Sequence, residues 1–210
     1  MEIAIALFNQ VTALDAVGPY EVLQRLPGAE VRFVGYRRGE VRTDNGFLGL
    51  TVDFTFDEVS RPDIVLIPGG VGTRSLVHDD VVLDWIRNAH ETSQFTTSVC
   101  TGSLLLAAAG LLNGRKATTH FSARPLLLKY GATPVEDRVV QEGKIITAAG
   151  VSSGIDMALR LAELLTDATT AKALQLMIEY DPQPPYDAGA LHKVDANVLS
   201  RVQELARDKN

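Results

Sequence analysis

The sequence predicts an α/β protein built on a doubly wound, mostly parallel sheet with helices on both faces. Short apolar segments rich in β-branched residues alternate with longer helical patterns, and this alternation is typical of βαβ units. Several strand segments are apolar throughout, as strands covered on both faces are. The chain has 210 residues, 46% of them hydrophobic, which is enough for one sizeable core.

The first half of the chain opens with an apolar strand and then a helical stretch around Val17 to Leu26. Residues 41–56 form a β-excursion that turns at Asn45-Gly46, a dipeptide typical of tight hairpins. The other strands expected here are IAIALF (3–8), VRFVGY (31–36) and DIVLIPGG (63–70).

The second half continues the alternation. Asp79 and Asp80 can start a helix, and the helix over 101–112 is expected to stop at Asn113-Gly114. The strands expected here are FTTSV (95–99), KATTHF (116–121) and a pair within 138–150 that turns at Glu142-Gly143. Two helical patterns follow, over 153–166 and 168–180.

The strongest loop signal is DPQPPYDAG (181–189), and an amphipathic helix is expected after it, over 194–208. We therefore predict one α/β domain over 1–190 and a C-terminal helical extension over 191–210. Such an extension can pack on a partner subunit or on its own subunit, and the sequence leaves both open.

Composition narrows the class of protein. The formal charge of −6 opposes binding to nucleic acid or to an anionic membrane surface. No apolar run is long enough to cross a bilayer, and the N-terminus lacks the basic region of a secretory signal. One cysteine cannot form an internal disulfide, so a reducing cytoplasm is expected.

Cys100 is that cysteine, and it stands where a strand pattern gives way to a helix pattern. In a parallel sheet this junction lies at the carboxyl end of a strand, where ligand crevices open. The start of the following helix favours the thiolate, and the small residues Gly102 and Ser103 let helix and strand approach closely. Cys100 is thus either a nucleophile or a buried small hydrophobe.

Asp15 follows the first strand among apolar neighbours, beside Gly18-Pro19. At a strand's carboxyl end its carboxyl could face the same crevice as Cys100. Burial there would raise its pKa and keep a proton available. The alternative is that Asp15 caps the N-terminus of the next helix.

Glycines in IPGGVG (67–72) can direct backbone N–H groups into a crevice, although any sharp turn uses such glycines. The segment matches neither a phosphate loop nor the dinucleotide fingerprint. None of the histidines has metal-ligand spacing, so no metal site is expected. They are His78, His90, His120 and His192, and of these His120 could reach the crevice, although a structural role is the preferred interpretation.

Taken together, strand-IPGG, strand-SVCTG-helix and the acid after the first strand resemble the ThiJ/PfpI superfamily, in the same order and along nearly the whole chain. The resemblance implies a flavodoxin-like fold related to class I glutamine amidotransferase domains. Several longer segments are similar to its isocyanide hydratase branch. They are LDAVGPYEVL, IPGGVGT, TSVCTGSLLLAAAGLLNGRKATTHF, AAGVSSGIDMALRLAE and EYDPQPPYDAG.

The resemblance implies roles for particular residues. Cys100 would be the nucleophile, and Asp15 would replace the glutamate that many members use as the acidic partner. Thr101 stands where protease-like members carry histidine, which puts peptidase activity in doubt. The N–H groups of Gly70 and Thr101 would stabilise negative charge, and Gly150 and Val151 would lie near the thiol.

The implied activity is that of a hydro-lyase that needs no cofactor. It converts an isocyanide and water to an N-substituted formamide through a thioimidate on Cys100, with Asp15 as acid and base. One alternative is a glyoxalase- or deglycase-like enzyme acting on reactive carbonyls. Another is a redox or small-molecule sensor that uses the thiol as a switch. A homodimer is expected because superfamily members commonly form one.

Overall fold

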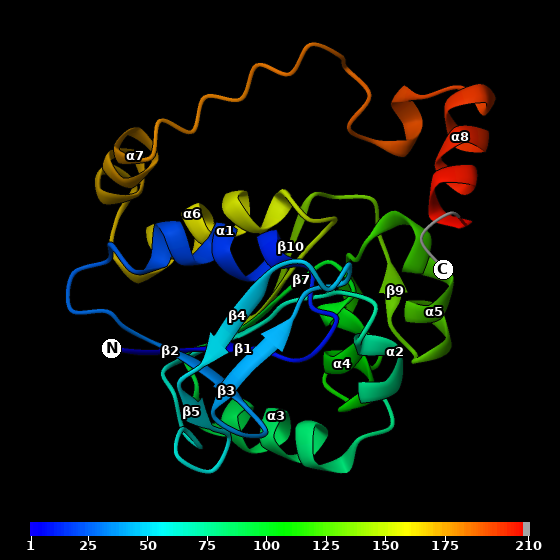
Figure 1. Ribbon diagram of the computed structural model, residues 1–210. Coiled ribbons are helices and arrows are strands. Elements are labelled where there is room, and N and C mark those ends of the chain that lie inside the picture. Colours follow the sequence, from blue (N-terminus) through cyan, green and yellow to red (C-terminus); the bar gives the residue numbers. More distant parts are fainter. Residues whose placement is uncertain (208–210) are drawn as a thin grey trace. The chain divides into compact units, whose positions relative to one another are not determined.

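The computed structural model describes residues 1–207, and a seven-stranded sheet lies at its centre (Figure 1). The strand order is β10-β11-β7-β6-β1-β2-β5. Every neighbouring pair is parallel except β10 and β11. The strands are β1 (Glu2–Ala6), β2 (Glu30–Gly35), β5 (Phe54–Thr55), β6 (Ile64–Ile67), β7 (Phe95–Val99), β10 (Val139–Glu142) and β11 (Ile145–Ala148). The predicted fold class is confirmed.

Helices cover both faces of this sheet. On one face lie α1 (Ala13–Leu23) and α6 (Ser153–Leu165), followed in the chain by α7 (Ala168–Met177). On the other lie α3 (Asp80–Thr92) and α4 (Gly102–Ala108). Each face has its own cluster of buried apolar side chains, and β6, which lies between them, is apolar throughout.

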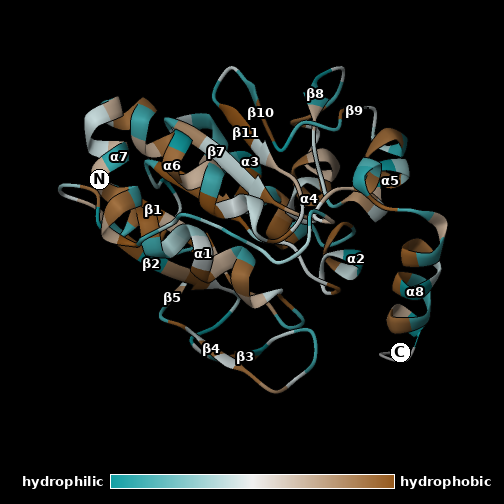
Figure 2. Cartoon of the chain, turned by 90° about the horizontal axis from the view of Figure 1, so that it is seen from above, coloured by the Kyte–Doolittle hydropathy of each residue, from teal (hydrophilic) through white to brown (hydrophobic). Residues whose placement is uncertain are grey.

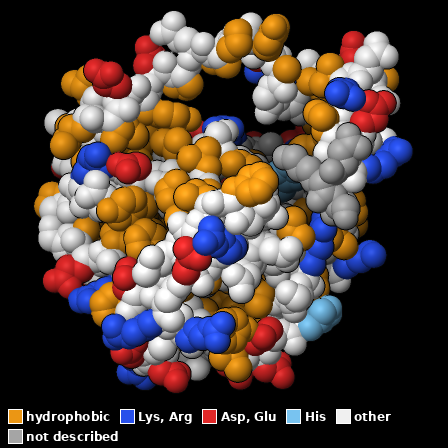
Figure 3. All heavy atoms as spheres, viewed as in Figure 1, with side chains coloured by type: hydrophobic (Ala, Val, Ile, Leu, Met, Phe, Trp, Pro, Cys, Tyr) orange, Lys and Arg blue, Asp and Glu red, His pale blue; other side chains and the backbone are white. Residues whose placement is uncertain are grey.

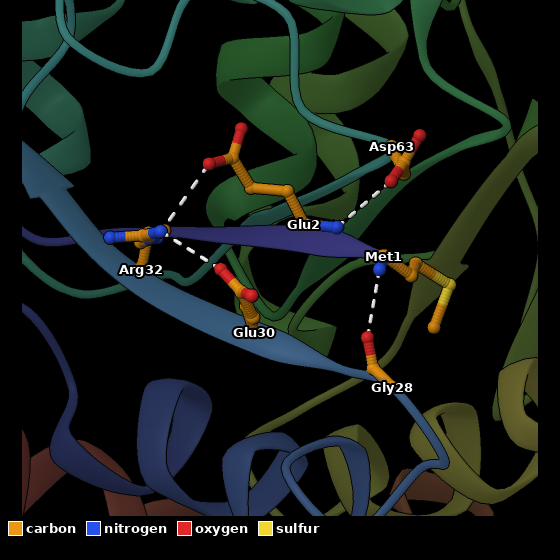
Figure 4. Close-up of polar contacts among 6 residues, drawn as sticks. All are labelled: Met1, Glu2, Gly28, Glu30, Arg32 and Asp63. Carbon is orange, nitrogen blue, oxygen red and sulfur yellow. Dashed lines mark hydrogen bonds and ion pairs between the residues drawn. The ribbon is translucent and has the colours of Figure 1, made fainter.

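Hydrogen bonds and ion pairs anchor the N-terminal end of β1, an inner strand of the sheet (Figure 4). The N–H of Glu2 donates to Asp63 Oδ2 at 2.8 Å, and the Met1 ammonium donates to the Gly28 carbonyl at 2.8 Å. Arg32 of β2 forms ion pairs with acidic side chains of both strands. These contacts hold the register at the end of the sheet opposite to the crevice.

The β-excursion is confirmed as an antiparallel hairpin of β3 (Gly39–Arg42) and β4 (Gly49–Val52). Its turn contains Asn45-Gly46, and Gly46 has the positive φ of +75° that the dipeptide predicts. After the hairpin the chain enters β5 at the edge of the main sheet.

Two predicted helix boundaries are wrong. Helix α1 begins at Ala13, ahead of the expected start near Val17, and contains Pro19. Helix α4 ends at Ala108, well before Asn113-Gly114. Gly110 stops it with a φ of +85°, and the N–H of Leu111 bonds to the Leu106 carbonyl at 3.0 Å, as in a Schellman motif.

The strand expected over 116–121 is also shorter than predicted. Only β8 (Lys116–Ala117) forms, and it pairs with β9 (Thr133–Pro134) in a separate small sheet. His120 therefore lies outside any strand, at the start of the 3-10 turn η1 (Phe121–Ala123). Short helices that the patterns did not indicate are α2 (Thr73–Leu76), α5 (Arg124–Lys129) and η2 (Leu191–Lys193).

The chain forms two compact units, one over Met1–Ile178 and one that starts at Glu179. The second contains α8 (Ala196–Arg207), which carries both hydrophobic and hydrophilic residues and has no buried side chain (Figure 2). The predicted helix over 194–208 is therefore present, while Asp208 lies outside the described residues. The division at residue 190 stays a prediction.

Acidic and basic side chains are interspersed on the face that Figure 3 presents. None of the helices between residues 1 and 207 is both long enough and apolar enough to span a membrane.

Candidate active site

Cys100 occupies the turn between β7 and α4 in a strained conformation. Its φ is +57°, in the left-handed region that costs a residue with a side chain about 1–2 kcal/mol. Neighbouring segments hold it there: its N–H donates to the Ala149 carbonyl at 2.8 Å, and its own carbonyl accepts from Thr119 Oγ1 at 3.0 Å. This turn directs the thiol away from the strand and into the crevice at the carboxyl ends of the sheet.

Gly102 makes the turn possible. A Cβ at this position would lie 2.1 Å from the Ile67 carbonyl oxygen of β6, where no side-chain atom fits. The close approach of helix and strand that the sequence predicted is therefore present, and it depends on a glycine at the first position of α4.

Asp15 lies in the first turn of α1 and is fully buried. Its Oδ2 accepts the N–H of Gly69, from the loop after β6, at 2.9 Å. Oδ1 is buried without an N–H or O–H donor, and the Cys100 thiol is the side-chain hydrogen-bonding neighbour of the carboxyl. The alternative that Asp15 is a helix cap is wrong, because α1 starts earlier and Thr12 holds the N-cap position.

Burial decides the protonation of both groups. It raises the pKa of Asp15 to about 7, partly offset by the Gly69 and Cys100 hydrogen bonds, and the charge of Asp44 raises it further. Burial and the Asp15 charge raise the pKa of Cys100 to about 12. The N–H groups of Val151 and Thr101 bond to the sulfur and lower this pKa, but by less. The helix start is expected to favour the thiolate, but burial acts in the opposite direction and favours the protonated thiol in the resting site.

Thr101 connects the thiol loop to the glycine loop. Its Oγ1 accepts the N–H of Gly70 at 2.9 Å and lies 3.1 Å from Thr73 Oγ1. Gly70 has a φ of +137° and approaches the Gln10 carbonyl too closely for a side chain. The Gly70 N–H is thus already bonded in this structure, whereas the Thr101 N–H bonds to the Cys100 sulfur.

The loop after β11 brings Val151 and Gly150 to the other side of the thiol. The Val151 N–H bonds to the Cys100 sulfur, and Gly150 packs against the ring of His120, whose Cδ2 would be 3.0 Å from a Cβ there. His120 Nδ1 lies 2.8 Å from Ser122 Oγ, and burial lowers the pKa of His120. The ring is therefore neutral at neutral pH and belongs to the wall of the site.

A cavity of about 310 Å³ opens over the thiol. It is lined by Thr12, Asp44, Gly70, Val71, Thr73, Arg74, Cys100, Thr101, Leu104, His120, Ser122, Ala123, Leu126 and Val151. A further cavity of about 340 Å³, near the end of β2 and the β3–β4 hairpin, contains neither Cys100 nor Asp15 in its lining.

Sequence reasoning missed Thr12, Asp44 and Arg74 at this cavity. Thr12 Oγ1 donates to Asp44 Oδ2 at 2.7 Å, so the hairpin loop reaches the start of α1. No local pattern marks these residues, because nothing in a hairpin sequence says over which strand end it folds. Across residues 1–207, no group of three His, Cys, Asp or Glu side chains is arranged to hold a metal ion.

The sequence matches the model of the DJ-1/PfpI family over residues 1–164. The chain belongs to the DJ-1/PfpI family. Cys100 and the buried Asp15 both lie within the matched residues.

Individual members of the DJ-1/PfpI family extend the likeness to the rest of the chain. The chain is 42% identical to a protein named isonitrile hydratase from Pseudomonas putida over 206 residues, which is 98% of this chain and 90% of that protein. It is 25% identical to a protein named deglycase PfpI from Pyrococcus furiosus, over 70% of this chain and 89% of that one. The first of these likenesses includes the C-terminal unit.

Solved structures of DJ-1/PfpI proteins superpose on this chain. A ThiJ/PfpI family protein from Pseudomonas syringae superposes with a TM-score of 0.93 at 38% identity, covering 99% of this chain and 86% of that one. Drosophila melanogaster DJ-1beta superposes with a TM-score of 0.77 at 23% identity, covering 85% of this chain and 97% of that one. The second likeness concerns the fold alone.

Proposed function

We propose that the chain is an isocyanide hydratase, which adds water to an isocyanide and releases an N-substituted formamide. The observation that carries the proposal is the identity of 42% over nearly the whole chain to an isonitrile hydratase. The buried pair of Cys100 and Asp15 supports it, because the reaction needs a soft nucleophile and one group that both takes and gives a proton.

In the first half of the reaction the thiol adds to the isocyanide. The Asp15 carboxylate takes the thiol proton as the sulfur bonds to the terminal carbon of R–N≡C. Asp15 then delivers that proton to the same carbon, which gives the thioimidate R–N=CH–S on Cys100. The pKa of Asp15 near 7 suits both transfers at neutral pH.

In the second half water replaces the sulfur. The water oxygen attacks the thioimidate carbon while the Asp15 carboxylate accepts a proton from the water. Asp15 then passes that proton to the thioimidate nitrogen. The resulting R–NH–CH(OH)–S intermediate loses the sulfur as the C=O bond forms. The hydroxyl proton returns through Asp15 to the sulfur, which restores the thiol and leaves R–NH–CHO.

The remaining predicted residues would support these steps. The N–H groups of Thr101 and Val151 stabilise charge that develops on the sulfur when its proton leaves. Gly70 would contribute its N–H only if the Thr101 hydroxyl released it, so its main role is to let the loop pass close to Gln10. Gly150 keeps the Val151 loop against His120.

The test is to incubate the purified protein, with its thiol reduced, with p-nitrophenyl isocyanide and to follow formation of the formamide. Cys100→Ala and Cys100→Ser serve as controls and are expected to fold without turnover. Undiminished turnover in either variant would remove Cys100 from the mechanism. If the wild type forms no formamide but consumes methylglyoxal, the deglycase-like alternative replaces the proposal. If it consumes neither compound, the sensor alternative remains.

We also propose that the protein acts as a homodimer in the cytoplasm and needs neither a metal nor an organic cofactor. The amphipathic helix α8, which buries none of its side chains, supports the dimer. Its exposed apolar residues include Val198, Val202 and Leu205. Light scattering coupled to size exclusion measures the mass directly, and a monomer at micromolar concentration would contradict this proposal.

A further inference from the structure

The β3–β4 hairpin is fastened to the start of α1 by several hydrogen bonds. Val11 and Thr43 form a β-bridge, the N–H of Asp44 donates to the Val11 carbonyl at 3.1 Å, and Thr12 Oγ1 donates to Asp44 Oδ2 at 2.7 Å. The carboxyl of Asp44 is therefore fixed at the rim of the cavity that contains Cys100.

The charge of Asp44 is not neutralised. Eleven ion pairs involve other residues of the part of the chain that the structure describes, and none of them includes Asp44. Its carboxylate accepts only the neutral hydroxyl of Thr12 among the described side chains. Thr12 precedes α1, and Asp15 follows in the first turn, so this negative charge lies near the buried carboxyl.

We propose that Asp44 is a positioning residue, held by Thr12 so that its charge makes Asp15 a stronger base toward the thiol and the attacking water. The proposal rests on the hydratase function and deepens it, because it assigns to the hairpin a part in the chemistry. It also gives a reason for the hairpin's attachment to α1, which the central sheet does not require.

Other charged and titratable groups face the same site. Cys100 keeps its proton, and burial keeps His120 neutral. Arg74 lines the cavity from α2 and brings a positive charge to it. Burial is the largest cause of the raised pKa of Asp15, and the charge of Asp44 adds to it.

The sign of the effect follows from the proton count. The active site needs Asp15 ionised and Cys100 protonated, so kcat/KM rises with pH as Asp15 loses its proton, near pH 7. Asp44→Asn removes a like charge, which lowers the pKa of Asp15. The rise should move to lower pH by roughly half a unit, because a screened charge at the rim acts less than one in direct contact. The plateau should fall as well, because the base becomes weaker.

The experiment measures kcat/KM from pH 5 to 9 with p-nitrophenyl isocyanide, and the ¹³C chemical shift of the Asp15 carboxyl over the same range. Asp57→Asn is the matched control, since Asp57 is exposed and outside the cavity. It should leave both curves unchanged. Raising the salt concentration should move the wild-type curve toward that of Asp44→Asn and move the variant less.

Thr12→Val distinguishes the effect of the Asp44 charge from the effect of the hydrogen bond that holds Asp44 to Thr12. It removes the hydrogen bond but leaves the charge, so its curve should lie between wild type and Asp44→Asn. An Asp15 titration that is unmoved in Asp44→Asn overturns this proposal whether or not the enzyme turns over. Absence of formamide in the wild type, with an Asp15 titration that does shift, overturns the hydratase function instead.

Discussion

Replacing Asp15 by asparagine should make the protein more stable as it makes it inactive. The buried carboxyl has a pKa of about 7 in the folded protein, against an ordinary 3.8. The carboxyl therefore ionises at a lower pH in the unfolded chain than in the folded protein. As the pH rises from 3.8 to about 7, the folded state loses stability relative to the unfolded state. About 3 pH units at about 1.4 kcal/mol each give a cost of about 4 kcal/mol above pH 7.

Asparagine has nearly the same shape and cannot ionise, so it avoids that cost while its Oδ1 can still accept the Gly69 N–H. We expect Asp15→Asn to raise the free energy of unfolding by about 2–4 kcal/mol at pH 8 and to change it little at pH 4. For a chain of this length that corresponds to a rise in Tm of roughly 5–15 °C at the higher pH.

The assay is urea unfolding of both proteins at pH 4, 6 and 8 with the thiol reduced, beside turnover of p-nitrophenyl isocyanide. Asp57→Asn, an exposed acid, controls for the lost charge and should show no pH-dependent gain. A gain that is the same at pH 4 and pH 8, or no gain at pH 8, would refute the reasoning. A variant that retains turnover would remove Asp15 from the proposed mechanism.

Three substitutions test two glycines and a helix cap, and a fourth serves as their control. Gly69→Ala would place a Cβ 2.5 Å from the Thr101 backbone nitrogen, so we expect a loss of about 1–3 kcal/mol in unfolding free energy and at least tenfold in turnover. Gly189→Ala has open space and should change neither quantity. Gly110→Ala meets no neighbour but keeps a φ of +85°, so calorimetry should show a loss of about 1 kcal/mol with turnover intact. Asp79→Ala removes the side-chain cap of α3 and should cost about 1 kcal/mol by the same measurement, and an unchanged Tm would contradict the cap.

Local chemistry predicted the parts of the fold that it controls. Asp79 caps α3 by accepting the N–H groups of Val81 and Val82, and Asn45-Gly46 turns the hairpin, as their types indicate. The strand FTTSV has the predicted bounds because a β-branched run fits a buried strand and ends where Cys100 turns.

Tertiary packing decided what the patterns missed. Gly18-Pro19 favours a late helix start, yet α1 runs through both residues because it packs on α6, where a Cβ on Gly154 would meet Pro19 Cγ at 3.0 Å. The same packing turns Asp15 inward. Its pairing with Cys100 could be anticipated from strand ends, but the raised pKa of the thiol depends on burial, which sequence spacing does not give.

The two edges of the central sheet limit how copies of this chain can associate. At one edge β5 offers only two residues for hydrogen bonding, and at the other β10 runs against its neighbour β11. A continuous sheet across two subunits at β5 would start from a template too short to hold a register. Assembly there is disfavoured, and so is the edge-to-edge aggregation that long exposed strands invite. A stable pair of subunits is therefore not expected to be joined through β5, so mutations on β5 should leave the oligomeric state unchanged.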